Sequence, residues 1–378
     1  MASEMSLLLY TAPAGTFVLL LPKGANWRRS IQAQGGFWQG TCTLRGEAGP
    51  LVNAFYNWLG YHLVERAAGV VTWEGMVYEL ELTIGGVVRR RSLADLFNAV
   101  STTYQANGEV AETGYSTQAQ SITRYGRKEE KLLLDNYPLA TAQAYRATFL
   151  ADHAWPWPRP TSLGKPGAAT LTITACGYAF TANWMFVEAG DATDDDLDDW
   201  MAEIVGAATG LSSNHGGAIS GAGDCQFLKT GSLATNTLQA TKVADSPARA
   251  WDVIAELAQL GDANGDPWRV WVDVGRLVHY AKISSTPRYF LHGGVLYSTA
   301  GAREAVTPWS VRPAVVRDLD YPVARAERGS WLDDARDLFV EEVEVDEAGT
   351  LSLRTAATQH SDIRAAQYAE YEVPEAEE

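Results

Sequence analysis

The cysteines and histidines are the side chains best suited to covalent catalysis or metal binding. Cys42, Cys176 and Cys225 are far apart, none belongs to a CxxC pair, and none stands beside a histidine at a metal-ligand spacing. The pattern predicts small, buried, reduced thiols and no zinc site. The six histidines are scattered along the chain, and His279 falls within an expected strand, where we predict a hydrogen-bonded structural role.

Two acidic runs resemble cation sites. In residues 193–200, TDDDLDDW, we predict instead that Thr193 caps a helix whose first turn carries the carboxylates. Residues 262–266, DANGD, depart from a calcium loop because glycine is fourth rather than sixth and the twelfth position is Asp273, so we predict an Asx-type turn. The buried stripe expected on the first of these helices is Leu197, Met201, Ile204 and Val205.

The most site-like loop is residues 212–217, SSNHGG, which combines hydroxyls, an imidazole and glycines. No acidic residue stands close in sequence to orient the imidazole. HExxH, GxxxxGK[ST] and GxSxG are absent, and no GxGxxG follows a strand. The 46 acidic residues contain many pairs that suit glycoside hydrolysis and single out none. The sequence therefore predicts no enzymatic activity and no catalytic, cofactor-binding or metal-binding residue.

Length and charge limit the function further. The chain has 378 residues, which suggests two or three domains, and 30 cationic against 46 acidic residues give a net charge of −16. A surface this acidic repels nucleic-acid phosphates, which argues against sequence-specific DNA binding. The single cationic cluster, Arg89, Arg90 and Arg91, is expected to be a solvated or subunit-facing patch.

Hydrophobic periodicity predicts that the first hundred residues are mostly strand. The apolar runs 7–10 and 17–21 are expected to form a hairpin, since each is too short to cross a bilayer and no cation precedes Lys23 as a secretory signal requires. Further strands are expected at residues 27–33, 37–44 and 70–84, with a helix at 50–59 and a short helix at 93–98 capped by Ser92.

The rest of the chain mixes helices and strands. Residues 101–121 are polar and rich in small residues, so we expect a long loop or an extended arm. The alternating prolines of residues 155–160 predict a stiff linker and the main domain boundary. Helices are expected at residues 141–153 and after the Ser246-Pro247 pair as far as Gly261; strands are expected at 169–176, 178–187, 268–283 with a turn at Gly275-Arg276, and within 288–323; the acidic tail 374–378 is expected to be solvated.

Four motifs in a constant order carry a family resemblance. WEGMV at residues 73–77 leads into the long strand, and SLADLFNAV at 92–100 with Tyr104 follows a Gly-Gly turn. YGRKEE at 125–130 precedes the alanine-rich helix, and AWDVIAEL at 250–257 precedes Leu260-Gly261-Asp262 and Trp268. Their order over residues 27–323 resembles that of tailed-bacteriophage baseplate hub and tail-tip proteins.

The resemblance implies a β-rich α+β fold with two tail-tube-like β-barrel or sandwich domains and small interposed α+β domains. The corresponding division is residues 1–100 with part of 288–378 as the first tube-like domain, and 101–160 as arm, helix and linker. Residues 161–190 with 220–287 would form the second β domain, and 191–219 and 246–261 its helical insertions.

The function implied by the resemblance is structural. The chain would be a virion protein made in the host cytoplasm, a homotrimeric hub at the tail tip that closes the tail tube while DNA passes through the ring without specific contacts. Its partners would be the distal tail or tube ring, the tape-measure protein, and a central fibre or tip protein. A hexameric distal tail protein or another minor tail protein is the first alternative, and a tail-borne carbohydrate-active hydrolase the second.

Overall fold

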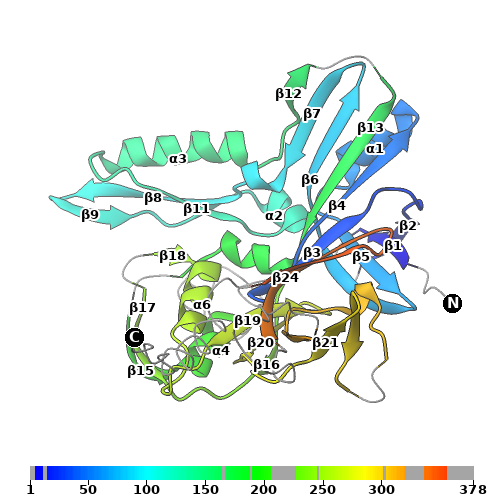
Figure 1. Ribbon diagram of the computed structural model, residues 1–378. Coiled ribbons are helices and arrows are strands. Elements are labelled where there is room, and N and C mark those ends of the chain that lie inside the picture. The colour runs from blue at the N-terminus through cyan, green and yellow to red at the C-terminus, as the bar shows by residue number, and fades with distance from the viewer. Residues whose placement is uncertain are drawn as a thin grey trace, which may run out of the picture.

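The computed structural model describes residues 5–11, 15–163, 167–187, 190–205, 227–244, 247–300, 304–319 and 336–355. Within these residues the chain forms a β-rich α+β fold, which confirms the expected fold class. Figure 1 shows an upper sheet, an arm that projects to one side of it, and a lower part built from shorter strands and helices. The presence of two tail-tube-like domains and the four-part division stay predictions.

The upper sheet is organised by one long strand, β6. The strands of this region are β1 (Met5–Tyr10), β2 (Phe17–Leu20), β3 (Arg28–Gln32), β4 (Gly35–Gly46), β5 (His62–Ala67), β6 (Val70–Ile84), β7 (Val87–Ser92), β12 (Arg159–Leu163) and β13 (Ala169–Cys176). The first half of β6 pairs with β5, and its second half lies between β7 and β13. β13 also pairs with β4, and β4 pairs with β3. Strands that precede and strands that follow residues 99–153 in the sequence therefore share one sheet.

The predictions for the first hundred residues are confirmed except for the short helix at 93–98, which is a 3-10 turn over residues 93–95. β1 and β2 form the N-terminal hairpin, and β6 occupies the expected residues 70–84. α1 (Ala48–Asn57) buries Leu51 and Phe55 at helical spacing, and Ser92 caps the short η1 (Leu93–Asp95) by accepting from the Ala94 amide. Edge-to-face contact between Trp27 and Trp73, whose ring centroids are 5.3 Å apart, lies within the core behind the sheet.

The arm, defined here as residues 99–153, corrects one prediction. Its elements are β8 (Ala99–Ala106), β9 (Glu109–Glu112), β10 (Ser116–Thr117), α2 (Ala119–Tyr125), β11 (Glu129–Leu132) and α3 (Leu139–His153). Of the two forms expected at 101–121, the long loop is wrong and the extended arm is confirmed, because β8 and β9 form a hairpin closed by Asn107 and Gly108 with φ of 53° and 87°. Two consecutive positive φ angles are what a tight hairpin turn needs, and Asn-Gly supplies them at little cost.

The lower part corrects three further predictions. Its elements are η2 (Tyr178–Trp184), β14 (Phe186–Val187), β15 (Gly190–Asp196), α4 (Leu197–Val205), β16 (Lys229–Leu233), β17 (Gln239–Ala244), β18 (Ala248–Arg249), α6 (Ala250–Gln259), β19 (Trp268–Asp273) and β20 (Leu277–Lys282). The strand expected at 178–187 is mostly η2, because burial around most of this turn overrides its strand-like composition. Thr193 lies in β15 and not at a helix cap, and α6 begins at Ala250, too late for Pro247 to lie in its first turn.

The apolar faces of the two lower helices are as expected. Leu197, Met201, Ile204 and Val205 of α4 are buried. Trp251, Ile254, Leu257 and Ala258 of α6 are buried against the same core, and α6 ends before Gly261, whose φ is +74°. The β19–β20 hairpin turns at Gly275 and Arg276 as predicted. None of the described helices combines the length and the hydrophobicity that a membrane span requires.

The last described strands return to the upper sheet. They are β21 (Tyr289–His292), β22 (Val295–Ser298), β23 (Val315–Asp318), β24 (Arg336–Asp346) and β25 (Leu351–Thr355), with η3 (Pro308–Ser310) between β22 and β23. β24 pairs with both β3 and β25, and a separate small core lies among these strands. The region 288–323 therefore contains the short strands that its sequence predicts.

The proline-rich stretch at 155–160 is packed against the sheet. Arg91 Nε donates to the Pro156 carbonyl at 2.9 Å, and the Trp155 ring meets Tyr125 edge-on at 6.2 Å. β12 then pairs with β7, and β13 enters the sheet between β4 and β6. The strands of residues 159–176 thus continue the sheet that begins at the N-terminus, across the boundary expected near residue 160.

Candidate functional site

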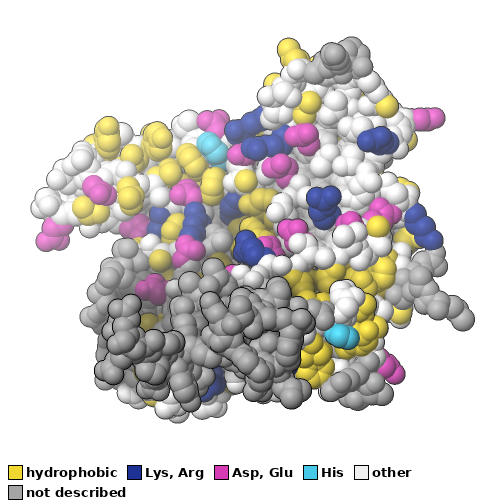
Figure 2. Space-filling view, viewed as in Figure 1, with side chains coloured by type: hydrophobic (Ala, Val, Ile, Leu, Met, Phe, Trp, Pro, Cys, Tyr) yellow, Lys and Arg dark blue, Asp and Glu magenta, His cyan; other side chains and the backbone are white. Residues whose placement is uncertain are grey.

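The most unusual surface of the molecule is on the arm. α3 is fifteen residues long and buries only Ala142, yet Arg146 is its only charged side chain between Leu139 and Ala151. An exposed helix ordinarily has charged residues on its outer face, so this composition suits a helix that another surface covers. Figure 2 shows hydrophobic side chains gathered along this part of the arm. The exposed large hydrophobic residues of the arm are Val110, Leu133, Tyr137, Leu139 and Tyr145.

Buried hydrogen bonds of Asn98 and Lys128 hold the base of the arm against the body of the molecule. The Asn98 amide donates to the Gly126 carbonyl at 2.7 Å and accepts from the Lys128 backbone amide at 2.7 Å. Lys128 Nζ donates to the carbonyls of Leu93 and Ala94 at 2.7 and 2.9 Å. Burial, with the nearby Arg249 charge, lowers the pKa of the Lys128 ammonium to about 7. These contacts join β8 and β11 to the end of the sheet.

A second set of contacts joins the arm to the lower part. The buried Glu129 carboxylate accepts from Arg127 Nε at 2.7 Å and from the Phe186 amide at 3.1 Å. Arg249 pairs with Glu130 at 2.7 Å and stacks on the Phe186 ring, with 4.0 Å between the guanidinium carbon and the ring centroid. The arm is therefore connected at its base to β14 and β18 while its outer half projects free of them (Figure 1).

The closest arrangement to an acid–base site is the cluster of His62, Glu74 and Tyr178. His62 Nδ1 lies 2.7 Å from the Tyr178 hydroxyl, and Nε2 lies 3.8 Å from a Glu74 oxygen. Burial, followed by the charge of Arg276, lowers the pKa of His62 to about 4, and burial raises the pKa values of Glu74 and Tyr178. Glu74 also accepts from the Arg276 amide at 2.9 Å, so the cluster ties the β19–β20 turn to β5 and β6.

Another buried cluster surrounds Glu65. Its carboxylate accepts from Trp27 Nε1 and Thr72 Oγ1, each at 2.5 Å, and from Arg29 at 3.3 Å. Arg29 donates in addition to the Trp309 carbonyl at 2.8 Å. Glu65 and Arg29 have no exposed side-chain surface, so this ion pair holds residues of three distant segments together and offers no group to a substrate.

Cys42, Cys176, His279 and Asp262 occupy positions in which their side chains support the fold. Burial raises the pKa of both Cys42 and Cys176 to about 12, which makes these thiols poor nucleophiles. His279 Nδ1 accepts from the Ser232 amide at 3.2 Å. Asp262 Oδ1 accepts from the amides of Asn264 and Asp266 at 2.9 and 3.0 Å, which confirms the Asx-type turn.

Some predictions lie outside the described residues, namely Cys225, the loop 212–217, Ser246 and the tail 374–378. In the part of the chain that the structure describes, no group of three or more His, Cys, Asp or Glu side chains is arranged to hold a metal ion.

The arginine cluster is only partly a surface patch. Arg91 is buried and donates to the carbonyls of Phe55 and Tyr56, both at 2.8 Å, where α1 ends. A cation at this position satisfies carbonyls that have no partner within the helix. Arg90 pairs with Asp95 at 3.3 Å, and Arg89 alone is exposed. The prediction of a solvated or subunit-facing patch is thus wrong for Arg91.

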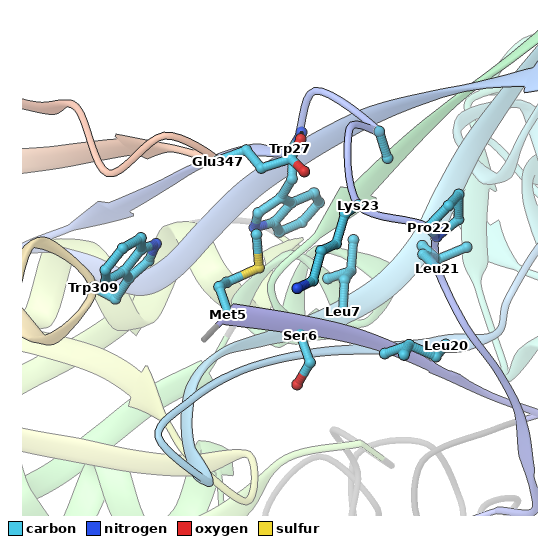
Figure 3. A pocket seen from close by; sticks show the side chains of 11 residues that line it. Met5, Ser6, Leu7, Leu20, Leu21, Pro22, Lys23, Trp27, Trp309 and Glu347 are labelled. Atoms are coloured by element: carbon cyan, nitrogen blue, oxygen red, sulfur yellow. The ribbon is translucent and has the colours of Figure 1, made fainter. Parts of the chain in front are cut away.

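A cavity of about 490 Å³ lies beside the N-terminal hairpin, and the sequence had not indicated it (Figure 3). Its walls are mostly apolar, with Lys23 and Glu347 among the few polar groups, and they come from segments more than 300 residues apart in the chain. No local pattern connects these segments, which is why the cavity emerges only from the tertiary structure. The lining residues are Met5, Ser6, Leu7, Leu20, Leu21, Pro22, Lys23, Ala25, Trp27, Trp309 and Glu347.

The structural likenesses of the chain include two tail proteins. No protein-family model and no curated protein matches the chain. The chain is similar to a tail protein from Neisseria meningitidis MC58, with 8% identity and a TM-score of 0.43 over 93% of this chain and 96% of that one. It is similar to the same degree, 8% identity and a TM-score of 0.43, to the 43 kDa tail protein of prophage MuSo2 from Shewanella oneidensis, over 94% and 96% of the two chains.

Proposed function

We propose that the chain is a structural protein of a bacteriophage tail and acts as a baseplate hub. In this role, copies of the chain form a closed ring, a trimer, at the tip of the tail tube, and DNA passes through the ring during ejection. The support is the order of the four motifs over residues 27–323 together with the exposed arm. The two structural likenesses are not part of that support, since their TM-scores lie below 0.5.

The observation that carries the proposal is the nearly uncharged outer surface of α3. Figure 1 shows α3 on a segment that leaves the body of the molecule sideways. A projecting element that binds a different surface on the next copy makes a head-to-tail contact. Such contacts generate a ring when the rotation between successive copies brings the last copy back to the first. The buried hydrogen bonds of Asn98 and Lys128 at the base of the arm suit this use, because a ring of fixed size requires a fixed angle between copies.

The partners follow from the place of a hub in the virion. One face of the ring would meet the distal tail or tube ring, and the other would meet the tape-measure protein and a central fibre or tip protein. We propose that the chain has no catalytic role, since its buried carboxylates and imidazole are engaged in contacts between its own elements.

The experiment is native mass spectrometry and sedimentation of the full chain, compared with two α3 variants. Tyr145→Glu and Ala147→Glu place a carboxylate on exposed positions of α3, and Val70→Glu does the same at an exposed residue away from the arm. We expect a trimer for the wild type and for Val70→Glu. The α3 variants should associate at least about tenfold more weakly, because a buried unpaired charge opposes the contact, with unchanged thermal unfolding.

Other outcomes distinguish the alternatives. A wild-type chain that stays monomeric at all concentrations contradicts the ring, and α3 variants that still form trimers contradict the assigned surface. A hexamer favours a distal tail protein. Reproducible hydrolysis of peptidoglycan or capsule by the purified chain would favour the carbohydrate-active hydrolase.

A further inference from the structure

Within the described residues, the outer edge of β2 is open and apolar. In the residue-by-residue registers of the described strands β2 pairs with β1 alone, and β1 is covered on its other side by β5. Exposed edge strands are usually protected by charges or proline, but β2 reads Phe-Val-Leu-Leu, and its end residues Phe17 and Leu20 are 52% and 56% exposed. The Leu21 amide donates to the Leu7 carbonyl, so alternation directs the Leu20 amide toward the open edge.

The cavity lies at the end of this edge. Leu20 and Leu21 form part of its wall, Trp309 forms the opposite side, and Leu7 and Trp27 lie between the two sides (Figure 3). A volume of about 490 Å³ is enough to receive apolar side chains of a bound segment. A strand that added to β2 would therefore have an apolar pocket within reach of its alternate side chains.

One wall of the cavity contains a buried donor without an acceptor. Trp309 Nε1 is buried and has no hydrogen-bond partner in the part of the chain that the structure describes. Figure 3 shows this nitrogen on the side of the ring that faces Trp27 and Met5, which is the side of the cavity. The Trp309 backbone is held by Arg29, which pairs with the buried Glu65, so the wall is fixed before any ligand arrives. A buried N–H of this kind calls for a carbonyl oxygen.

The polar rim favours an uncharged ligand. The Glu347 carboxylate accepts from the amides of Gly24 and Trp27, which places its charge on the loop that borders the cavity. Lys23 brings one positive charge to the same rim, so the rim has no excess of either sign. A polyanion gains little here, whereas a backbone with paired N–H and C=O groups and apolar side chains matches both the edge and the cavity.

We propose that β2 and the adjoining cavity bind an extended, apolar peptide segment of another protein. The segment adds to β2 as a further strand, places an apolar side chain in the cavity, and accepts a hydrogen bond from Trp309 Nε1 through a backbone carbonyl. This surface is distinct from α3, so the inference does not depend on ring formation.

The test measures binding of a panel of blocked ten-residue peptides with alternating β-branched and polar residues to the full-length chain by fluorescence anisotropy. Leu20→Lys adds a charge at the edge, and Trp309→Phe removes the N–H while keeping an aromatic wall. We expect saturable binding that either variant weakens about tenfold, as expected for a central contact. Leu260→Lys and Trp157→Phe, which make the same kinds of change at exposed residues elsewhere, should bind as the wild type does.

Three results would overturn the inference. The first is a panel with no binding member, and the second is equal binding by all variants. The third is a change in oligomer mass on Leu20→Lys in the absence of peptide, which would assign the edge to a second copy. Amide exchange gives an independent measurement, since a bound strand should slow exchange of the Leu20 amide in the wild type and not in Trp309→Phe.

Discussion

At the residue scale, the buried charged groups of this chain connect elements that are distant in sequence. Glu65 joins β5 to Trp27 and Arg29, and Arg29 reaches Trp309. Glu129 joins the arm to Phe186 in the same way. Such groups stabilise a fold only while every partner is present, because a buried charge that loses its partner keeps its full desolvation cost.

Glu65→Gln should therefore be strongly destabilising. The substitution keeps the size of the side chain but leaves the buried Arg29 guanidinium without a counter-charge, so we expect a loss of about 3–5 kcal/mol in the free energy of unfolding. Urea unfolding followed by tryptophan fluorescence measures this. Glu304→Gln, at an exposed position, is the matched control and should change stability by less than about 0.5 kcal/mol. Equal effects of the two substitutions would contradict the structural role of Glu65.

His62 should make stability depend on pH. Its pKa is lowered from 6.5 to about 4 in the folded chain, so the unfolded chain takes up a proton first as the pH falls. The stabilisation is fully present above pH 6.5 and is lost between 6.5 and about 4, which amounts to about 3 kcal/mol for this pKa difference. We expect His62→Gln to remove this part of the pH dependence in urea unfolding measured at pH 7 and pH 4. Parallel profiles for the two proteins would show that His62 titrates normally.

At the element scale, close approaches of backbones decide where strands meet. β4 and β19 run parallel for a short distance, with Gly36 opposite Val272. The φ of Gly36 is +74°, and a Cβ placed there would lie 2.0 Å from the Val272 carbonyl oxygen. Only glycine allows this contact, which connects the upper sheet to the β19–β20 hairpin.

Gly36→Ala should separate these two elements. Because backbone atoms cannot move aside as a flexible side chain does, we expect a loss of at least about 2 kcal/mol in unfolding free energy. The control is Gly46→Ala in the same strand, where a Cβ would meet no atom within 4 Å. Thermal unfolding of both variants measures the difference, and a Gly36→Ala protein as stable as Gly46→Ala would contradict the close approach.

At the scale of the whole molecule, the acidic composition and the arm are the two features that bear on function. A net charge of −16 repels nucleic acid, which suits a ring through which DNA passes without adhering. This use of the charge is part of the proposed hub role.

The purified chain should accordingly not retain linear duplex DNA. We expect no mobility shift at about 0.15 M salt, where only clustered cations could overcome the overall repulsion. A shift that weakens steeply as salt is raised would reveal a cationic surface and contradict this prediction. The α3 variants provide the control, because loss of the ring should leave the result unchanged.

The sequence by itself determined most of the local structure. Alternation along residues 70–84 and helical spacing in residues 51–55 predicted β6 and α1, since burial of one face imposes these periods. The Gly275-Arg276 turn and the Asx-type turn at Asp262 could also be predicted, because the side chains and φ preferences of a few neighbouring residues determine such turns. The error at 178–187 arose where tertiary burial overrode a local preference. Thr193 lies in β15, whose pairing with the distant β17 no local pattern indicates.

Only the tertiary structure decided how these pieces combine. The insertion of β13 between β4 and β6, the burial of Arg91 against the end of α1, and the cavity between Leu20 and Trp309 all join segments that no local pattern relates. The exposure of α3 could not be predicted from the sequence either, since an alanine-rich helix is expected to be buried unless its neighbours in space are known. Short-range preferences specify elements, whereas pairing across long loops depends on which apolar surfaces and buried charges find partners in the whole chain.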